Sequence, residues 1–176
     1  MAALISLMQI DCMTYPHISG YRQLRNGRRS IPGQLYLLTT VTHRRQPHFL
    51  DPSLARTAAR VLSTSTLWFP SRCLSWVLMP DHWHGLIELG EDVGLSTTVQ
   101  RVKGVTAHIV KQQCAFEGPL WAKGFHDHAL RRDESVEKVT GYIIANPVRA
   151  RLVRDPMDYP YWDACFMGGG ISAHAL

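Results

Sequence analysis

Long apolar runs and paired cysteines are missing from this chain of 176 residues. No run of about 18 consecutive apolar residues occurs, so the sequence predicts no membrane-spanning helix and no membrane partner. The opening residues lack the basic start and the cleavage signature of a signal peptide. The four cysteines form no C-x-x-C pair, which disfavours a zinc ribbon and a disulfide framework. Together these absences predict a cytoplasmic protein.

Lysine is also scarce, whereas arginine is abundant. Only four of the nineteen basic residues are lysines, and the formal net charge is +5. The arginines cluster in the segments YRQLRNGRRS, THRRQ, ALRRD and VRARLVR. A planar guanidinium can bind a phosphate through two hydrogen bonds, whereas an ammonium acts as a point charge. The bias indicates either a solvated basic surface or a nucleic-acid partner.

The length suits a single domain with one hydrophobic core. Prolines and glycines interrupt the start of the chain, so we expect an irregular segment over residues 1–20. The domain is expected over residues 21–165. A flexible glycine-rich tail is expected over residues 166–176.

The pattern of apolar residues predicts alternating strands and helices within this domain. β-branched and aromatic residues indicate strands over residues 34–43, 73–80, 82–89 and 120–132. Apolar residues at helical spacing indicate helices over residues 51–68, 95–114 and 133–146. The order βαββαβ plus a terminal helix is typical of the ferredoxin-like α+β fold, an antiparallel sheet with helices on one face. This architecture supports many chemistries and does not indicate a function by itself.

Two histidines lie in the predicted strand 82–89. His82 and His84 are two residues apart, so their side chains point to the same face of the sheet. Two adjacent imidazoles can share one metal ion. Two ligands do not complete a site, however, and structural hydrogen bonds explain an isolated pair at least as well. A second pair, His126 and His128, has the same spacing further along the chain.

The last predicted helix carries residues that would complete such a site. Tyr142 and Asn146 are four residues apart, on one face of the helix. The asparagine carbonyl suits a hard divalent cation, although an asparagine before Pro147 is also a normal helix stop. Imidazole and amide ligands are neutral, so a cation that they hold keeps its full charge to polarise a phosphate. A nearby tyrosine would then be an available nucleophile, and adjacent cations would reduce the roughly 4 kcal/mol that its ionisation costs near pH 7.

Several segments taken together resemble a known family. In chain order they are GRRSIPGQLYLLTTVTHRR, MPDHWHGLIEL, LWAKGFHDHALR, GYIIANPVRARLV and DYPYWDA. This combination resembles the REP-associated tyrosine transposases, a branch of the single-tyrosine HUH transposases related to the IS200-like family. HUH denotes two histidines around a hydrophobic residue, which His82, Trp83 and His84 match. The resemblance extends over residues 21–165, which it identifies as a catalytic domain.

The resemblance implies a reaction and a substrate. Tyr142 would attack a phosphodiester of single-stranded DNA and form a 5′-phosphotyrosine link, leaving a free 3′-hydroxyl. His82, His84 and Asn146 would bind Mg²⁺ or Mn²⁺, although close relatives have glutamine at the asparagine position. The implied substrate is a REP hairpin with an adjacent tetranucleotide, which would bring the protein to the nucleoid. A monomer and a homodimer are both compatible with the sequence.

Arginines and aromatic residues are the candidate DNA contacts. Arginine binds both phosphates and guanine edges. We expect hairpin contacts from Arg28, Arg29, Arg44 and Arg45, and contacts near the active site from Arg131, Arg132 and Arg149. The candidates for stacking on unpaired bases are Tyr21, Tyr36, Trp83 and Trp121. For Tyr36 and Trp121, packing in the core is the alternative.

Three alternative functions remain. A non-catalytic protein could bind hairpin DNA or RNA on the same fold. A zinc hydrolase could combine His82 and His84 with His126 or His128. Because Asp127 replaces the hydrophobic residue of the HUH pattern, the second pair is better explained by structural or DNA-contacting roles. A replication initiator or relaxase of the HUH class is the nearest catalytic alternative.

Overall fold

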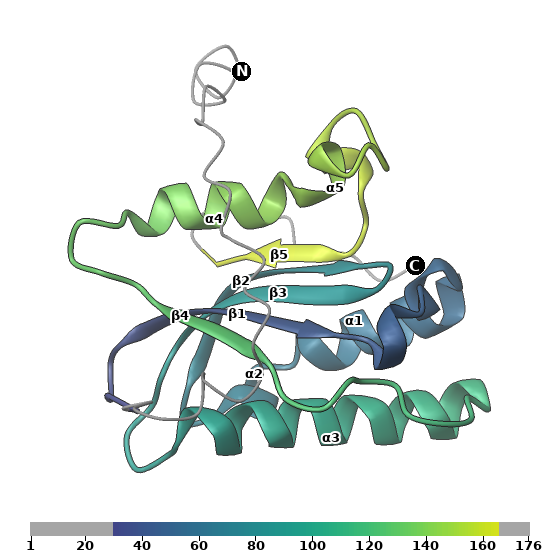
Figure 1. Ribbon diagram of the computed structural model, residues 1–176, viewed down its shortest axis with the longest axis horizontal. Helices are drawn as coiled ribbons and strands as arrows, with labels where there is room; N and C mark the ends of the chain where they lie inside the picture. Colours follow the sequence, from purple (N-terminus) through teal and green to yellow (C-terminus); the bar gives the residue numbers. More distant parts are fainter. Residues whose placement is uncertain (1–29, 166–176) are drawn as a thin grey trace.

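The computed structural model of the protein describes residues 30–165. The irregular segment and the glycine-rich tail expected at the two ends lie outside these residues. Five strands form one antiparallel sheet in the order β4-β1-β3-β2-β5 (Figure 1). Their bounds are Leu35–Val41 for β1, Arg72–Met79 for β2, His82–Glu88 for β3, His126–Ala129 for β4 and Trp162–Ala164 for β5.

The expected βαββαβ order is confirmed, but two strands differ from the prediction. β4 is regular over only four residues, because the chain turns at Gly124, which has a φ of 78°. Upstream of that turn, Trp121 forms only an isolated bridge to Thr42. β5 was not predicted, because its three residues are too few to show an alternating pattern. β5 pairs with β2 and extends the sheet beyond the four predicted strands.

Three helices cover one face of the sheet. They are α1 over Pro52–Leu62, α2 over Ser65–Trp68 and α3 over Leu95–Cys114. α3 has the predicted bounds, whereas the helix predicted over residues 51–68 is broken into α1 and α2. The break lies at Ser63 and Thr64, whose hydroxyls donate to backbone carbonyls one turn back at 2.9 and 3.1 Å. Such side-chain bonds compete with the helical backbone pattern.

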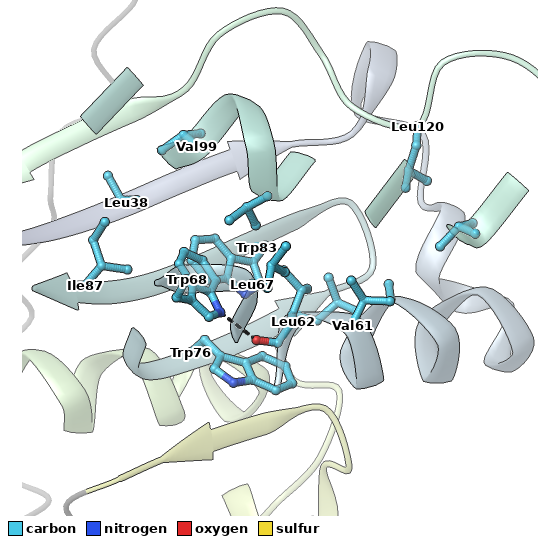
Figure 2. Close-up of a cluster of buried hydrophobic side chains, with 14 of the residues drawn as sticks. Leu38, Val61, Leu62, Leu67, Trp68, Trp76, Trp83, Ile87, Val99 and Leu120 are labelled. Atoms are coloured by element: carbon cyan, nitrogen blue, oxygen red, sulfur yellow. Dashed lines mark hydrogen bonds between the residues drawn. The ribbon is translucent and has the colours of Figure 1, made fainter. Parts of the chain in front are cut away.

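Two stacked tryptophans form the centre of this helix-covered core. The rings of Trp68 and Trp83 lie 5.5 Å apart between centroids, with 19° between their planes (Figure 2). The indole nitrogen of Trp68 donates to the carbonyl of Leu62 at 2.8 Å. Trp83 is 2% exposed and Tyr36 3% exposed, so neither can stack on a DNA base. The stacking expectation is wrong for Trp83, whereas for Tyr36 the alternative of core packing is confirmed. Trp121 is half-buried against the same core, and Tyr21 lies outside the described residues.

The helix α4, over Val136–Ile144, lies on the opposite face of the sheet (Figure 1). The sheet therefore has α1 to α3 on one face, as expected, and the terminal helix on the other. Val139 and Ile143 of α4 are buried in a second apolar cluster with Val77 and Leu86 of the sheet. None of the helices within residues 30–165 is long and apolar enough to span a bilayer.

Candidate active site

The alternation of β3 places its two histidines on the α4 face of the sheet. Trp83 belongs to the tryptophan core, whereas Leu86 belongs to the α4 cluster. His82 and His84 share the face of Leu86 because side chains two residues apart point the same way. Their rings lie 4.7 Å apart between centroids and are nearly perpendicular, at 79°. Both side chains are half-buried, so the pair lies at the surface of the apolar cluster and not within it.

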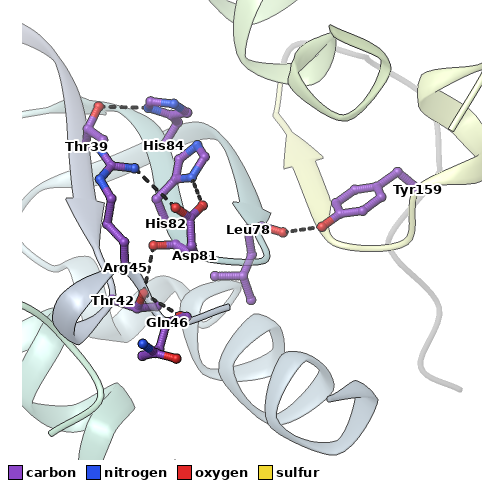
Figure 3. Close-up of polar contacts among 9 residues, drawn as sticks. All are labelled: Thr39, Thr42, Arg45, Gln46, Leu78, Asp81, His82, His84 and Tyr159. Atoms are coloured by element: carbon purple, nitrogen blue, oxygen red, sulfur yellow. Dashed lines mark hydrogen bonds and ion pairs between the residues drawn. The ribbon is translucent and has the colours of Figure 1, made fainter. Parts of the chain in front are cut away.

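Each imidazole has its Nδ1 atom engaged by a neighbouring side chain. His82 Nδ1 lies 2.5 Å from Asp81 Oδ1, and His84 Nδ1 lies 2.8 Å from Thr39 Oγ1 (Figure 3). Thr39 on β1 is the direct cross-strand partner of His84. These contacts leave Nε2 of each ring as the nitrogen for a metal ion.

The site favours neutral histidine beside ionised carboxylate. Burial lowers the pKa of His84 to about 3, and electrostatic interactions with His82 and Arg149 lower it further. The hydrogen bond with His82 lowers the pKa of Asp81 to about 2, with a further contribution from Arg45. At neutral pH His84 is therefore uncharged, which is the form that binds a metal. Asp81 carries a full negative charge under the same conditions.

Tyr142 faces this pair from α4. The centroid of its ring lies 6.3 Å from that of His84, at an angle of 64° between planes. The guanidinium of Arg149, in the short helix α5 (Asn146–Arg149), lies over the tyrosine ring with Cζ 4.6 Å from the centroid. The structure thus brings together the two histidines, the tyrosine and one of the predicted arginines.

Asn146 lies at the junction of α4 and α5. Its Nδ2 donates to the carbonyls of Tyr142 and Ile143, at 2.9 and 3.2 Å. The helix-stop role that the sequence left open is therefore present. These two hydrogen bonds use the amide nitrogen of Asn146 and leave its side-chain carbonyl oxygen for another partner. Capping α4 and binding a cation are thus compatible roles for one side chain.

The imidazole nitrogens of His82 and His84 and the amide oxygen of Asn146, one helical turn after Tyr142, are neutral donors suited to a divalent cation. Within residues 30–165, no group of three or more His, Cys, Asp or Glu side chains is arranged to hold a metal ion. A third ligand to the histidine pair would therefore be a different donor, and the Asn146 amide oxygen suits Mg²⁺ or Mn²⁺.

The second histidine pair lies away from the first and has other contacts. His128 Nε2 lies 2.8 and 2.9 Å from the two carboxylate oxygens of Glu134. His126 is exposed on β4, in register with Thr39, so β1 lies between it and the histidine pair on β3. The zinc site that combined either residue with the first pair is therefore wrong for the described chain.

The arginines predicted to contact DNA differ in their surroundings. Arg44 and Arg45 are exposed in the short 3-10 helix η3 (His43–Arg45), which follows β1. Arg45 forms an ion pair with Asp81, with Nη1 3.1 Å from Oδ2. Arg131 and Arg132 are exposed in the turn before α4, and Arg28 and Arg29 lie outside the described residues.

Two residues of the site were not predicted from the sequence. They are Asp81, in the turn between β2 and β3, and Thr39, on β1. The position of Asp81 directly before the histidine pair was a usable signal. Thr39 had no such signal, because its contact with His84 depends on the register between β1 and β3.

Comparisons with known proteins place these features in a family context. A family model described as "Transposase IS200 like" matches residues 32–146. A REP-associated tyrosine transposase of Escherichia coli is 28% identical over 93 residues, which are 52% of this chain and 53% of that protein. A Haemophilus influenzae protein that bears the same name provisionally is 25% identical over 139 residues, or 73% of this chain and 78% of that protein.

One solved structure shares the fold. It is a REP-associated tyrosine transposase bound to a REP hairpin, with a TM-score of 0.59 and 23% identity. The match covers 82% of each chain. The five-stranded sheet and its helices are thus a known arrangement for proteins of this kind.

Proposed function

The chain belongs to the IS200-like transposase family, and from that premise we propose that it cleaves and rejoins single-stranded DNA beside REP-type hairpins. As a member of this family it is a DNA-cleaving enzyme. The proposal adds Tyr142 as the nucleophile, a 5′-phosphotyrosine intermediate and dependence on Mg²⁺ or Mn²⁺. The observation that carries it is the approach of Tyr142 to His84, two predicted site residues that lie far apart in the sequence.

Metal binding is assigned to His82, His84 and Asn146. The first two offer Nε2 atoms, and the third offers an amide oxygen. A divalent cation bound there would polarise the scissile phosphate and offset its developing negative charge. Because all three ligands are neutral, they subtract nothing from the charge of the cation.

Tyr142 performs the covalent step. Its phenolic oxygen attacks the phosphorus, loses its proton and forms a new P–O bond, while the bond to the 3′ oxygen breaks and that oxygen leaves as a hydroxyl. A later attack by a DNA 3′-hydroxyl on the phosphotyrosine reverses the exchange and rejoins the DNA. The guanidinium of Arg149 favours the phenolate that forms along this path.

DNA binding is assigned to exposed arginines around the site. Arg44, Arg131, Arg132 and Arg149 are exposed, and the whole chain carries a net charge of +5. The related protein solved with a REP hairpin supports a hairpin substrate for this chain. An adjacent tetranucleotide would lie unpaired near Tyr142.

A covalent-adduct assay tests the proposal. The native protein is incubated with a labelled REP hairpin oligonucleotide and Mn²⁺, and products are separated on a denaturing gel. We expect a protein–DNA adduct with the native chain and none with Tyr142→Phe, which lacks only the attacking oxygen. Tyr161→Phe is the matched control, because this half-buried tyrosine lies in the opposite core.

The same assay separates the enzyme from a non-catalytic hairpin binder. A binder would retard the oligonucleotide in native gels with both chains and form an adduct with neither. Absence of any adduct from native protein with Mn²⁺ or Mg²⁺ present would contradict the proposed function.

A further inference from the structure

Asp81 is held at both ends of its carboxylate. It occupies the two-residue turn between β2 and β3, with Oδ1 2.5 Å from His82 Nδ1 and Oδ2 3.1 Å from Arg45 Nη1 (Figure 3). Its backbone carbonyl accepts from the amide and the hydroxyl of Thr42, at 2.8 and 3.0 Å. With the turn fixed in this way, the carboxylate has little freedom to leave the imidazole.

Arg45 reaches Asp81 from a strained turn. Arg44 and Arg45 have φ values of 52° and 53°, in the left-handed region that residues with a Cβ rarely adopt. Each such residue costs on the order of 1–2 kcal/mol, so surrounding contacts must hold the turn. Thr42 supplies one of them, because its single hydroxyl proton is shared between the carbonyls of Asp81 and Gln46, the latter at 2.7 Å, and the ion pair of Arg45 with Asp81 supplies another.

The contact with Asp81 determines which nitrogen of His82 can bind a metal. A carboxylate accepts hydrogen bonds and cannot donate them, so Nδ1 of His82 carries the proton. The lone pair of the neutral ring is then on Nε2. Carboxylates placed in this way behind metal-binding histidines fix the ring orientation and raise its basicity.

We propose that Asp81 is a positioning residue, which holds His82 as the Nε2-binding tautomer while Arg45 holds Asp81 in place. The inference rests on the proposed function to the extent that His82 binds a cation. It adds a role for two residues that touch neither the cation nor the attacking tyrosine.

Metal affinity and tautomer state together test this role in the full-length protein without DNA. Mn²⁺ binding is measured by electron paramagnetic resonance, and the protonation of the histidine nitrogens by ¹⁵N NMR. We expect Asp81→Ala to weaken Mn²⁺ binding by roughly 10–100-fold. Asp81→Asn should weaken it less, because an amide oxygen still accepts from Nδ1. In the metal-free protein, Asp81→Ala should shift His82 away from the Nδ1-protonated form.

Glu88→Gln provides the matched control. Glu88 lies on the same strand and also forms an ion pair with an arginine, Arg72, but neither residue contacts His82. The Mn²⁺ affinity of Glu88→Gln should equal that of the native protein. Arg45→Ala should weaken binding by less than Asp81→Ala, because the carboxylate remains but is less constrained.

Three outcomes would contradict the inference. Unchanged Mn²⁺ affinity and an unchanged His82 tautomer in folded Asp81→Ala or Asp81→Asn would exclude a positioning role. If both variants lose Mn²⁺ as completely as His82→Ala, the carboxylate is itself a ligand. A native chain that binds no more Mn²⁺ than His82→Ala has no histidine site to position. Binding with the expected losses but without a DNA adduct would leave this inference standing and contradict only the proposed function.

Discussion

Arg149 places a positive charge over the ring whose oxygen is the proposed nucleophile. Its Cζ lies 4.6 Å from the centroid of Tyr142. We predict that Arg149→Ala slows adduct formation about tenfold, equivalent to about 1.4 kcal/mol, because the phenolate loses a neighbouring cation. Arg149→Lys should recover part of the rate.

Single-turnover cleavage at saturating DNA measures this effect separately from binding. Arg154→Ala, at an exposed arginine in the following turn, is the control for a general loss of charge. Equal rates for Arg149→Ala and Arg154→Ala would show that Arg149 contributes only to DNA binding.

Replacing Gly85 and Gly104 by alanine should change the free energy of unfolding in opposite directions. A Cβ on Gly85 would lie 2.1 Å from the ring of Trp83, which is itself stacked on Trp68. We predict that Gly85→Ala lowers the free energy of unfolding by about 1–3 kcal/mol, because the stack must shift. Gly104, in α3, has nothing within 4 Å of its Cβ position. Gly104→Ala should therefore stabilise the protein by about 0.5–1 kcal/mol.

Denaturant unfolding of the two variants gives both values directly. A Gly85→Ala variant as stable as the native protein would mean that the stacked tryptophans are loosely packed.

At the scale of elements, hydrogen bonds from Lys103 connect α3 to the segment that leads into β4. Its Nζ donates to the carbonyls of Ala122 and Gly124, at 2.7 and 2.5 Å. Burial lowers the pKa of this ammonium to about 8, from an ordinary 10.5. Between these two values the folded state has lost the proton and the unfolded state retains it. The contribution of this group to stability therefore rises with pH over that interval, by at most about 1.4 kcal/mol per pH unit.

Lys103→Met should remove this pH dependence. The measurement is the free energy of unfolding of the native chain and the variant from pH 7.5 to 10.5, with Lys111→Met as the exposed control on the same helix. Parallel curves for the native chain and Lys103→Met would contradict the lowered pKa.

Local sequence signals predicted most of these elements but not their limits. The bounds of α3 were predictable, because twenty residues of apolar periodicity outweigh weak local competitors. α1 and α2 were predicted as one helix, since the side-chain bonds of Ser63 and Thr64 leave the apolar pattern unchanged. The short β5 forms by pairing with a distant strand. Contacts of this kind cannot be predicted from local periodicity.

In the candidate site, too, local patterns were predictable and contacts between distant segments were not. His82, His84 and Tyr142 were predictable because their spacing matches a family pattern, and the structure brings them together. Asp81 and Thr39 escaped prediction because their roles depend on a turn and on strand register.

At the scale of the whole molecule, one chain supplies both histidines and the facing tyrosine. α4 is fixed to its own sheet by Val139, Ile143 and a buried contact of 3.2 Å between the hydroxyls of Thr140 and Ser75. We predict that Tyr142 acts on DNA held by its own chain. A mixture of Tyr142→Phe and His84→Ala proteins should then form no adduct, since neither chain carries a complete site.

The adduct assay on such a mixture tests the prediction, with each variant alone and the native chain as references. Recovery of up to about a quarter of native activity would instead indicate that α4 is exchanged between two chains, the level expected if random pairing completes one site in a mixed dimer.

Three consecutive residues of β3 point alternately to the two faces of the sheet. Trp83 packs in the core on one side of the sheet, while His82 and His84 lie on the other side, where His84 faces Tyr142. Changes around α4 can therefore accumulate with little effect on the tryptophan stack that stabilises the fold. A lineage with this architecture can therefore change exposed residues around the candidate site while the tryptophan core on the opposite face stays the same.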